Sequence, residues 1–377
     1  LSACGKKPAE TTSESAASGE AVETGTLKGE ITVQAEEGWV EYYQKAIDKI
    51  VAANPEAKIT IKQAGAFDHL DIISNTDATN ADVADVFAIP ADRFSDLAGN
   101  DVLAALPAKE MAEALGGFTD YDKGLGGNLK DGDSYLAFPF NIETLVTFVN
   151  TKNAEAEGID ASKPLEMTEQ KKAATILLPL FDAWYGVAPN NAGGIELLGK
   201  DGDNFVATYA SAYGELNADQ KAVFEAIYGY WKLNNDEGTS LFDAEAGWGY
   251  VDESFKTGGD TNGHVGVIRL GGPWDAAAFA EATEGNMEVY PIGQITIAGK
   301  PLTHWQGGWA LAANSRIEED ADKMALAEAL IKELVNPENA VELYKATGKI
   351  LENVTTDVYE NSDLSDLDNI TELKVID

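Results

Sequence analysis

The sequence predicts a two-lobed α/β protein, and three observations lead to that prediction. The chain has 377 residues, whereas a single hydrophobic core usually stops growing at about 250–300 residues. Strand and helix patterns alternate near the start of the chain, and helical periodicity dominates its middle part. No stretch of the sequence approaches the roughly 18 consecutive apolar residues that a membrane helix needs.

The first lobe begins with a strand over 30–35, where polar and apolar residues alternate. A helix over 40–51 follows, because its apolar residues recur at three- and four-residue spacings, and it ends at Asn54-Pro55. Two further strands are predicted over 58–62 and 83–89, the second almost continuously apolar. This order of elements is typical of an α/β lobe.

The middle of the chain predicts a hairpin and then a more helical lobe. Asp131-Gly132 lies between two alternating runs, which is a strong signal of a β-hairpin. A strand is predicted over 145–150. Helical periodicity then predicts helices over 168–184, bent by Pro179, and over 218–233.

The last part of the chain predicts two strands and two helices. A strand over 264–268 leads into Gly271-Gly272-Pro273-Trp274, and strand character returns over 287–292. The first helix spans about 321–335. The second has Asn336 at its N-cap, Pro337 in its first position and Gly348 just past its end.

The charge balance is strongly acidic, with 27 Lys and Arg residues against 64 Asp and Glu residues and a formal net charge of −37. Nucleic-acid binders gain most of their affinity when clustered Lys and Arg side chains release counterions from phosphates. The sequence contains no such cluster, which excludes nucleic acid as a partner. The acidic excess itself indicates a solvated surface.

The one cysteine, Cys4, lies in Leu1-Ser2-Ala3-Cys4-Gly5, which resembles the end of a bacterial lipoprotein signal whose cysteine is acylated. A lone cysteine forms neither an intramolecular disulfide nor a cysteine-based zinc site. The residues that follow are mostly small, polar or charged and bury too little apolar surface to offset chain entropy. We therefore expect 1–26 to be a lipid-anchor cysteine with a disordered polar tether; a chance cysteine in a frayed terminus is the alternative.

Motifs for nucleotides, metals and catalysis are missing from the sequence. There is no phosphate-binding GxxxxGK[ST] motif, and 124–127 lacks the spacing of a dinucleotide fingerprint. His69, His264 and His304 lie far apart without metal-ligand or triad spacing, so we interpret them as structural. We expect no catalytic residue, no cofactor and no metal.

Aromatic residues lie beside carboxylates at predicted strand ends and in loops. The acidic candidates follow three strands: Glu36 and Glu37 with Trp39, then Asp92 with Arg93, then Glu143. Because ligands of open α/β sheets bind at the carboxyl ends of strands, these groups could face one cleft. The remaining candidates are aromatic: Trp184, Tyr185, Trp274, Trp305 and Trp309.

This combination suits sugar recognition. Pyranose rings have apolar C–H faces that pack on flat aromatic rings, while carboxylates and the guanidinium fork satisfy their hydroxyls. Each side chain also has a structural interpretation. Trp231 lies on the apolar stripe of a predicted helix and is assigned to packing, Trp248 is undecided, and for Trp274 and Trp305, in Gly-rich segments, packing and binding both stay open. Each acid alone could equally be a solvated surface group.

The order of these features resembles the extracellular solute-binding proteins of ABC sugar importers, specifically the maltose/maltodextrin-binding branch. The resemblance covers about residues 27–350. Its most specific marks are Asp92-Arg93, the hairpin sequence 131–139 that leads to Glu143, and Gly272-Pro273-Trp274; Cys4, Glu36-Glu37 and the terminal Asn336-Pro337-Glu338 helix agree with it.

The resemblance implies a periplasmic-binding-protein-like fold: two lobes joined by hinge strands, with a ligand cleft between them. Lobe 1 would comprise 27–142 plus 307–346, and lobe 2 would comprise 143–306 plus 347–377. Asp92, Arg93 and Glu143 match positions that hydrogen-bond sugar hydroxyls from the first lobe, as Glu36 or Glu37 should. Trp274 matches an aromatic residue that stacks on a glucosyl ring from the second lobe, and Trp184-Tyr185 lies where another stacking residue is found.

Two departures from the family pattern affect these expectations. Ile89 replaces an aromatic residue that often lies three positions before the Asp-Arg pair, and the Trp305-Gln306-Gly307-Gly308-Trp309 segment is a candidate replacement. The family usually continues with further helices beyond the position of Gly348, so we expect either that the sequence given is truncated or that its second lobe is abbreviated.

The resemblance implies extracellular capture of a maltodextrin-type α-gluco-oligosaccharide and delivery to an ABC permease by closure of the cleft. The protein would be a monomer, exported and held at the outer face of the bacterial cytoplasmic membrane, at the cell surface or in the periplasm, through Cys4 only. A secreted glycoside hydrolase and a carbohydrate-adhesion module are the alternatives. A hydrolase would need two carboxyl groups about 5–5.5 or 6.5–9.5 Å apart.

Overall fold

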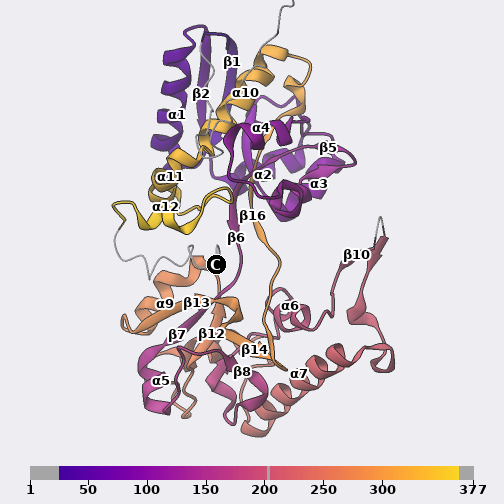
Figure 1. The fold of residues 1–377 in the computed structure, drawn as a ribbon, viewed down its shortest axis with the longest axis vertical. Helices are drawn as coiled ribbons and strands as arrows, with labels where there is room; N and C mark the ends of the chain where they lie inside the picture. Colours follow the sequence, from indigo (N-terminus) through magenta and orange to yellow (C-terminus); the bar gives the residue numbers. More distant parts are fainter. Residues whose placement is uncertain (1–24, 202–203, 365–377) are drawn as a thin grey trace, which may run out of the picture. The chain divides into compact units, whose positions relative to one another are not determined.

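The computed structural model describes residues 25–201 and 204–364 (Figure 1), so Cys4 and nearly all of the predicted tether lie outside the described residues. The described chain forms two compact units. Unit 1 comprises residues up to 142 together with 307–364, and unit 2 comprises 143–306. The breaks at 142/143 and 306/307 coincide with the predicted lobe boundaries.

The assignment of 347–364 to the second lobe was wrong, because this segment packs in unit 1. The Ile142 amide donates to the carbonyl of Ile350 at 3.2 Å. The Asn353 side chain donates to the carbonyl of Gly116 at 3.2 Å, and the Leu125 amide donates to the Glu352 carboxylate at 3.1 Å. The rest of the predicted second-lobe tail, 365–377, lies outside the described residues.

Unit 1 contains a five-stranded sheet in the order β2-β1-β3-β16-β6. Strands β1, β2 and β3 run parallel, and β16 runs antiparallel to β3 with Trp309 opposite Pro90. A two-stranded hairpin at Asp131-Gly132 confirms the predicted turn, with Gly132 at φ 60°. The strands are β1 Gly29–Ala35, β2 Ala57–Gln63, β3 Val86–Pro90, β4 Lys130–Asp131, β5 Ser134–Tyr135, β6 Phe138–Glu143 and β16 Gly307–Ala313.

The helices of unit 1 follow the sequence patterns closely. Helix α1 buries Tyr43, Ile47 and Ile50 and ends at Asn54, whose side chain donates to the Ile50 carbonyl at 3.0 Å. The terminal helix divides into a 3-10 turn, Pro337–Asn339, and α11, and Gly348 caps α11 at φ 71°. The helices are α1 Val40–Ala53, α2 Ala66–Asn75, α3 Phe94–Gly99, α4 Ala108–Leu115, α10 Ala321–Leu334, α11 Ala340–Thr347 and α12 Thr356–Glu360.

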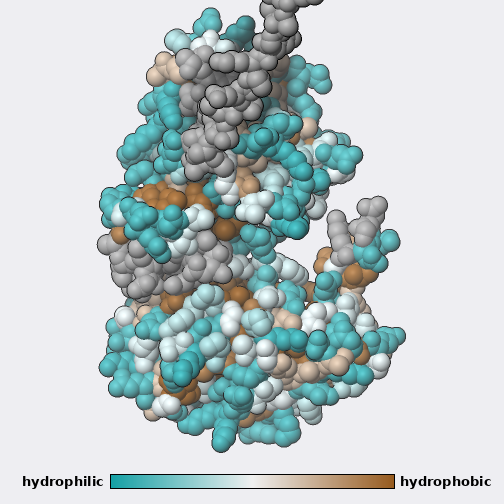
Figure 2. Space-filling model, viewed as in Figure 1, coloured by the Kyte–Doolittle hydropathy of each residue, from teal (hydrophilic) through white to brown (hydrophobic). Residues whose placement is uncertain are grey.

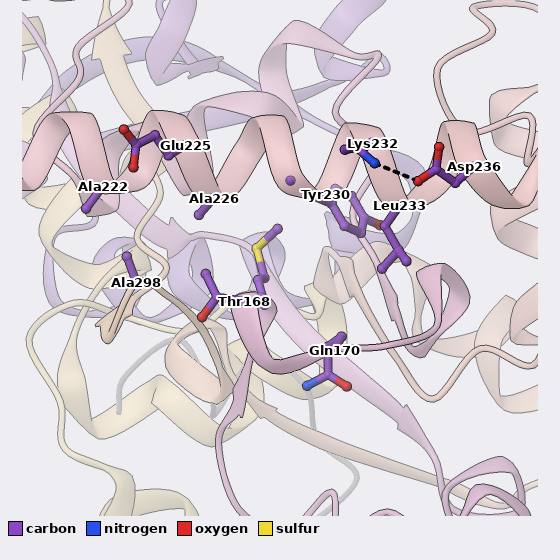
Figure 3. A pocket seen from close by; sticks show the side chains of 12 residues that line it. Thr168, Gln170, Ala222, Glu225, Ala226, Tyr230, Lys232, Leu233, Asp236 and Ala298 are labelled. Carbon is purple, nitrogen blue, oxygen red and sulfur yellow. Dashed lines mark hydrogen bonds and ion pairs between the residues drawn. The ribbon is translucent and has the colours of Figure 1, made fainter.

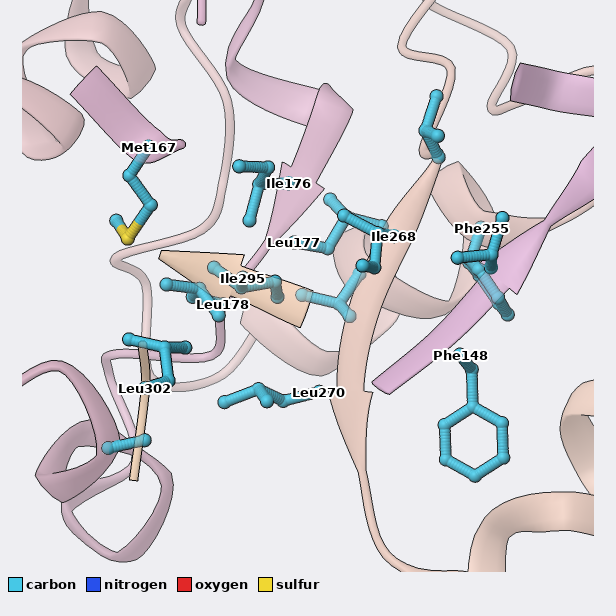
Figure 4. Close-up of a cluster of buried hydrophobic side chains, with 14 of the residues drawn as sticks. Phe148, Met167, Ile176, Leu177, Leu178, Phe255, Ile268, Leu270, Ile295 and Leu302 are labelled. Atoms are coloured by element: carbon cyan, nitrogen blue, oxygen red, sulfur yellow. The ribbon is translucent and has the colours of Figure 1, made fainter. Parts of the chain in front are cut away.

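Unit 2 contains a four-stranded sheet in the order β13-β7-β12-β9 and a three-stranded sheet in the order β15-β14-β8. Phe148, Ile176, Leu177 and Ile268 from the larger sheet lie in one buried cluster (Figure 4). The strands are β7 Val146–Asn150, β8 Leu165–Glu166, β9 Ile176–Leu177, β10 Gly199–Asp201, β11 Asn204–Val206, β12 Ile268–Gly271, β13 Met287–Pro291, β14 Ile295–Ile297 and β15 Lys300–Pro301.

The longest described helix of unit 2, α7, begins and ends as its sequence indicates. Asn217 and Gln220 form a reciprocal capping box at its start, and Gly238 ends it in the left-handed conformation. The helices of unit 2 are α5 Thr151–Glu157, α6 Ala183–Ala192, α7 Ala218–Glu237, α8 Gly247–Phe255 and α9 Ala276–Ala282.

Two predicted elements of unit 2 differ from the structure. The helix over 168–184 was wrong: 176–177 forms β9, which pairs parallel to β12, and α6 begins only at Ala183. A short buried apolar run satisfies a helix or a strand equally, and here the neighbouring strand decides. The strand predicted over 264–268 begins at Ile268, because the preceding residues form loop contacts, including a 2.7 Å bond from the Gly266 amide to the Ser254 carbonyl.

The surface of the described residues is mostly hydrophilic on the visible face (Figure 2), as the acidic composition predicts. Exposed aromatic side chains are concentrated in unit 2. Trp231, predicted to be a packing residue, is one of them: it is 40% exposed and stacks on Tyr228 with ring centroids 5.8 Å apart. Its assignment to packing was therefore wrong.

Candidate functional site

The acidic candidates of unit 1 lie at one edge of its sheet. Glu36 and Glu37 follow the carboxyl end of β1, and Asp92 and Arg93 follow that of the parallel strand β3. Strand β16 enters at the same edge, because Trp309 pairs with Pro90. The parallel arrangement thus brings polar groups from distant parts of the sequence together, as expected.

Two of these polar groups already have protein partners. The Glu36 carboxylate accepts from the Ala66 amide at 3.0 Å, so it binds one of the unpaired amides that begin α2. Arg93 Nε lies 3.4 Å from the Asp96 carboxylate, in a pair whose side chains are 41% and 72% exposed. Asp92 and Glu37 are exposed. The edge therefore offers carboxylate acceptors and a guanidinium donor to solvent.

Aromatic side chains join this edge from elements that the sequence analysis did not connect with it. Phe67, in the first turn of α2, is 62% exposed and contacts the Trp309 ring edge to face at 5.2 Å. The Trp309 amide donates to the Asn141 side chain at 2.9 Å, which ties β16 to β6. Position after a strand end is the signal that could have identified Phe67.

Trp39 does not lie on the surface of unit 1. Its side chain is only 6% exposed and packs against Tyr43 and Phe140. The ammonium of Lys349 lies 5.2 Å from the Trp39 ring centroid and 5.0 Å from that of Trp309. Trp39 is thus part of the core below the edge and offers almost no surface to a ligand, contrary to its prediction as a binding residue.

Unit 2 brings three predicted aromatic residues together in one exposed group. The ring centroids of Trp184 and Trp274 lie 5.9 Å apart, and His304 links Trp184 to Trp305 at 4.5 and 5.7 Å. Trp184, Trp274 and Trp305 are 42%, 54% and 42% exposed. We call Trp184, Trp274, His304 and Trp305 the aromatic surface of unit 2.

Local hydrogen bonds fix the two partners of the closest tryptophan pair. Asp182 caps α6 by accepting from the Trp184 amide at 3.0 Å. Trp274 lies in the 3-10 turn Pro273–Asp275 that follows β12, and the Asp275 carboxylate accepts from the Gly272 amide at 2.9 Å. Both indoles therefore project from the starts of short, capped helical segments.

His304 is a residue of this surface that sequence reasoning assigned to structure alone. Its Nε2 lies 2.8 Å from the Trp184 carbonyl and its Nδ1 lies 3.3 Å from the Trp305 carbonyl. Burial lowers the pKa of His304, which favours the neutral ring, and a neutral imidazole has one N–H with which to donate to one of these two carbonyl oxygens. His304 therefore hydrogen-bonds one of the two tryptophan segments at a time, while its ring lies against both indoles.

Tyr185 and the undecided Trp248 lie behind the aromatic surface. The ring centroid of Tyr185 lies 5.1 Å from that of Trp184 and 5.2 Å from that of Trp248. The ring centroids of Trp248 and Phe181 are 5.1 Å apart. Burial, with the nearby carboxylate of Asp275, raises the pKa of Tyr185 to about 12, so its hydroxyl is protonated at neutral pH. Both rings are half-buried.

Glu143 belongs to unit 2 in the structure, although the family resemblance places its role in the first lobe. It is half-buried at the end of β6. Its neighbour Thr144 donates to the carbonyl of Trp305 at 3.3 Å. The chain at Glu143 is thus connected through Trp305, His304 and Trp184 to Trp274.

A cavity of about 640 Å³ lies elsewhere in unit 2 and contains none of the predicted residues. It is a groove of unit 2 between α7 and the turn at 167–170 (Figure 3). Its α7 wall presents Ala222 and Ala226, and its Lys232 and Asp236 form an ion pair at 3.0 Å. Its other lining residues include Gln170, Glu225 and Tyr230, none of which the sequence analysis selected as a binding residue.

Two features typical of other classes of protein are absent from the described residues. Within 25–201 and 204–364, no group of three or more His, Cys, Asp and Glu side chains has the geometry to hold a metal ion. In the same part of the chain, no helix has the length and apolar character needed to cross a bilayer.

Several solved structures share this fold. The maltose-binding periplasmic protein MalE from Listeria monocytogenes, in complex with maltose, has a TM-score of 0.66 and 20% identity over 91% of this chain and 85% of its own. A cyclic α-maltosyl-1,6-maltose binding protein from Arthrobacter globiformis has a TM-score of 0.65 and 18% identity over 93% of this chain and 87% of its own. MalX from Streptococcus pneumoniae, in complex with maltopentaose, has a TM-score of 0.59 and 20% identity over 92% of this chain and 86% of its own.

At this level of identity these structures establish the two-lobe periplasmic-binding fold alone. No curated protein matches the sequence. Residues 31–372 match the family model described as bacterial extracellular solute-binding protein. That match spans nearly all of the sequence after the predicted tether, and the chain therefore belongs to the bacterial extracellular solute-binding proteins.

Proposed function

We propose that this protein binds a maltodextrin-type α-gluco-oligosaccharide outside the cell and delivers it to an ABC permease. The observation that carries the proposal is the aromatic surface of unit 2, in which three tryptophans are 42–54% exposed, Trp184 contacts Trp274 directly, and His304 lies between Trp184 and Trp305. Exposed indoles are costly in water and suit the apolar faces of pyranose rings, and each such contact contributes about 0.5–1.5 kcal/mol beyond its buried area.

The polar edge of unit 1 supports the same ligand class. Asp92 and Glu37 provide exposed carboxylates that accept from sugar hydroxyls, and Arg93 provides a planar set of donors. Phe67 and Trp309 add aromatic surface beside them. No catalytic step is required of these carboxylates, which would serve as hydrogen-bond acceptors only.

The ligands of the similar structures favour α-glucans over other sugars. Maltose is bound in the Listeria protein and maltopentaose in the Streptococcus protein. An oligosaccharide that engages both units would favour a closed arrangement by its differential affinity for that state, and the permease would recognise the closed form. The protein would act as a monomer, exported and anchored by an acyl group on Cys4.

Calorimetric titration with maltose, maltodextrins, xylo-oligosaccharides and galacto-oligosaccharides tests the proposal. We expect binding of maltose or maltodextrins and no binding of the xylose and galactose series. Chromatography of maltotriose and maltoheptaose after long incubation separates a binding protein from a hydrolase: intact sugars support the proposal, and shortened products contradict it. An adhesion module would give no response to any of these small sugars.

A further inference from the structure

A second cavity of unit 2, of about 480 Å³, lies beside the aromatic surface. Its walls come from α8, α9, β12 and the first turn of α6. We call it the Arg269 pocket and define it by six of the residues that line it: Tyr185, Trp248, Asp252, Arg269, Asp275 and Phe279. A volume of this size is within the range of small-ligand sites, about 300–1,000 Å³.

A buried arginine forms the polar core of this pocket. Arg269 is only 3% exposed, its Nη1 donates to the Asp252 carboxylate at 2.8 Å, and its guanidinium lies 4.0 Å from the Phe279 ring centroid. Arg269 Nη2, Asp252 Oδ2 and Asp275 Oδ1 make no hydrogen bond to any residue that the structure describes. The pocket thus keeps both donor and acceptor capacity.

The charges of the pocket favour a neutral ligand. Arg269 and Lys256 are balanced by Asp252 and Asp275, and Lys256 also pairs with Glu253 at 2.7 Å. A charged ligand would meet like charge as well as opposite charge, whereas a polyhydroxyl ligand can use donors and acceptors of both kinds. Trp248 and Tyr185 supply half-buried aromatic walls for apolar C–H faces.

Two residues connect the pocket with the aromatic surface. Tyr185 contacts Trp184 on one side and Trp248 in the pocket on the other, at 5.1 and 5.2 Å. Asp275, in the pocket, follows Trp274 directly and caps its turn through the Gly272 amide. We propose that the Arg269 pocket is a second carbohydrate subsite, which takes one additional sugar unit of an oligosaccharide bound on the aromatic surface.

This inference rests on the proposed function and predicts a dependence of affinity on ligand length. The pocket adds contacts only for oligosaccharides long enough to reach it, so the unaltered protein binds maltoheptaose more tightly than maltose. Filling the pocket removes the additional contacts and leaves the aromatic surface intact. A packing role of Arg269 alone predicts no such effect.

The test uses two matched substitutions on α9. Ala278 lines the pocket and is exposed, whereas its neighbour Ala277 is exposed and does not line it. Calorimetry with maltose and maltoheptaose compares the unaltered protein with Ala278→Trp and Ala277→Trp. We expect Ala278→Trp to weaken maltoheptaose binding about tenfold and to change maltose binding less than twofold. Ala277→Trp should change neither affinity by as much as twofold.

Asp252→Asn provides a second variant, because the amide keeps an acceptor for Arg269 and changes the hydrogen bonds offered to a sugar. It should also weaken maltoheptaose binding selectively, and the thermal transition of each variant verifies folding. Unchanged affinities in both variants, or equal losses for both sugars, overturn the second subsite and leave the proposed function standing. If the unaltered protein binds neither sugar, the proposed function fails and the subsite fails with it.

Discussion

The indole of Trp274 lies directly over Gly272. A Cβ atom at Gly272 would lie 2.2–2.3 Å from three atoms of that indole, far inside van der Waals contact. The backbone of Gly272, at φ −105° and ψ 167°, is one that any residue adopts. Glycine is therefore needed here for the space above it and not for its backbone conformation, and it sets where the exposed indole lies.

Gly272→Ala should displace the Trp274 indole and weaken maltodextrin binding by about tenfold or more, since one well-packed aromatic contact is lost or misplaced. Calorimetry measures the affinity, and the indole signals in an NMR spectrum report the displacement. Gly229→Ala is the matched control, because a Cβ at Gly229 in α7 meets no atom within 4 Å. Unchanged sugar affinity in Gly272→Ala would show that the indole position is unimportant for binding.

Trp274→Ala and Trp39→Ala should have opposite effects on binding and stability. Trp274 is 54% exposed, so its removal should greatly weaken sugar binding and hardly alter the thermal transition. Trp39 is 6% exposed, so its removal should cost about 3–5 kcal/mol of unfolding free energy. Calorimetric titration and urea unfolding measure the two effects. A large loss of stability in Trp274→Ala would identify it as a core residue.

Phe67→Ala tests the aromatic part of the unit 1 edge. Phe67 is 62% exposed and contacts Trp309, so its truncation should change the unfolding free energy by less than about 1 kcal/mol. We expect a loss of maltodextrin affinity of about threefold to tenfold, because one sugar-facing ring is removed. Phe205→Ala is a control on an equally exposed aromatic side chain of unit 2, 67% exposed, and should leave the affinity unchanged.

The stability of unit 1 should fall as the pH drops from about 6.5 to about 4. Burial, reinforced by the nearby Lys62 and Arg316 cations, lowers the pKa of His69 from 6.5 to about 4. The unfolded chain therefore binds more protons than the folded chain within that window, and the free energy of unfolding decreases with falling pH. Protonation would also place a proton on His69 Nε2, which accepts from the Ala84 amide at 3.0 Å.

His69→Gln isolates this contribution from the many acidic groups, because glutamine can accept from the same amide and does not titrate. Urea unfolding of both proteins at several pH values measures it. The difference in unfolding free energy between the two proteins should narrow or reverse as the pH falls through the window. A difference that is independent of pH would contradict the titration of His69.

The sequence by itself determined the elements whose signals are local. Asn54-Pro55 and Gly348 mark helix ends by chemistry that acts within a few residues, and Asp131-Gly132 marks its hairpin in the same way. The polar groups after β1 and β3 were also identified from the sequence, because parallel strands bring their carboxyl ends to one edge.

Only the tertiary structure decided which aromatic side chains face solvent and which run of apolar residues becomes a strand. Trp39, expected at the binding surface, is buried, and Trp231, expected in the core, is exposed, because burial depends on what packs over a side chain and not on its own sequence neighbours. Residues 176–177 became a strand because β12 lies beside them. Trp184 contacts Trp274 directly and is joined through His304 to Trp305, 121 positions further along the chain, by contacts that no local periodicity encodes.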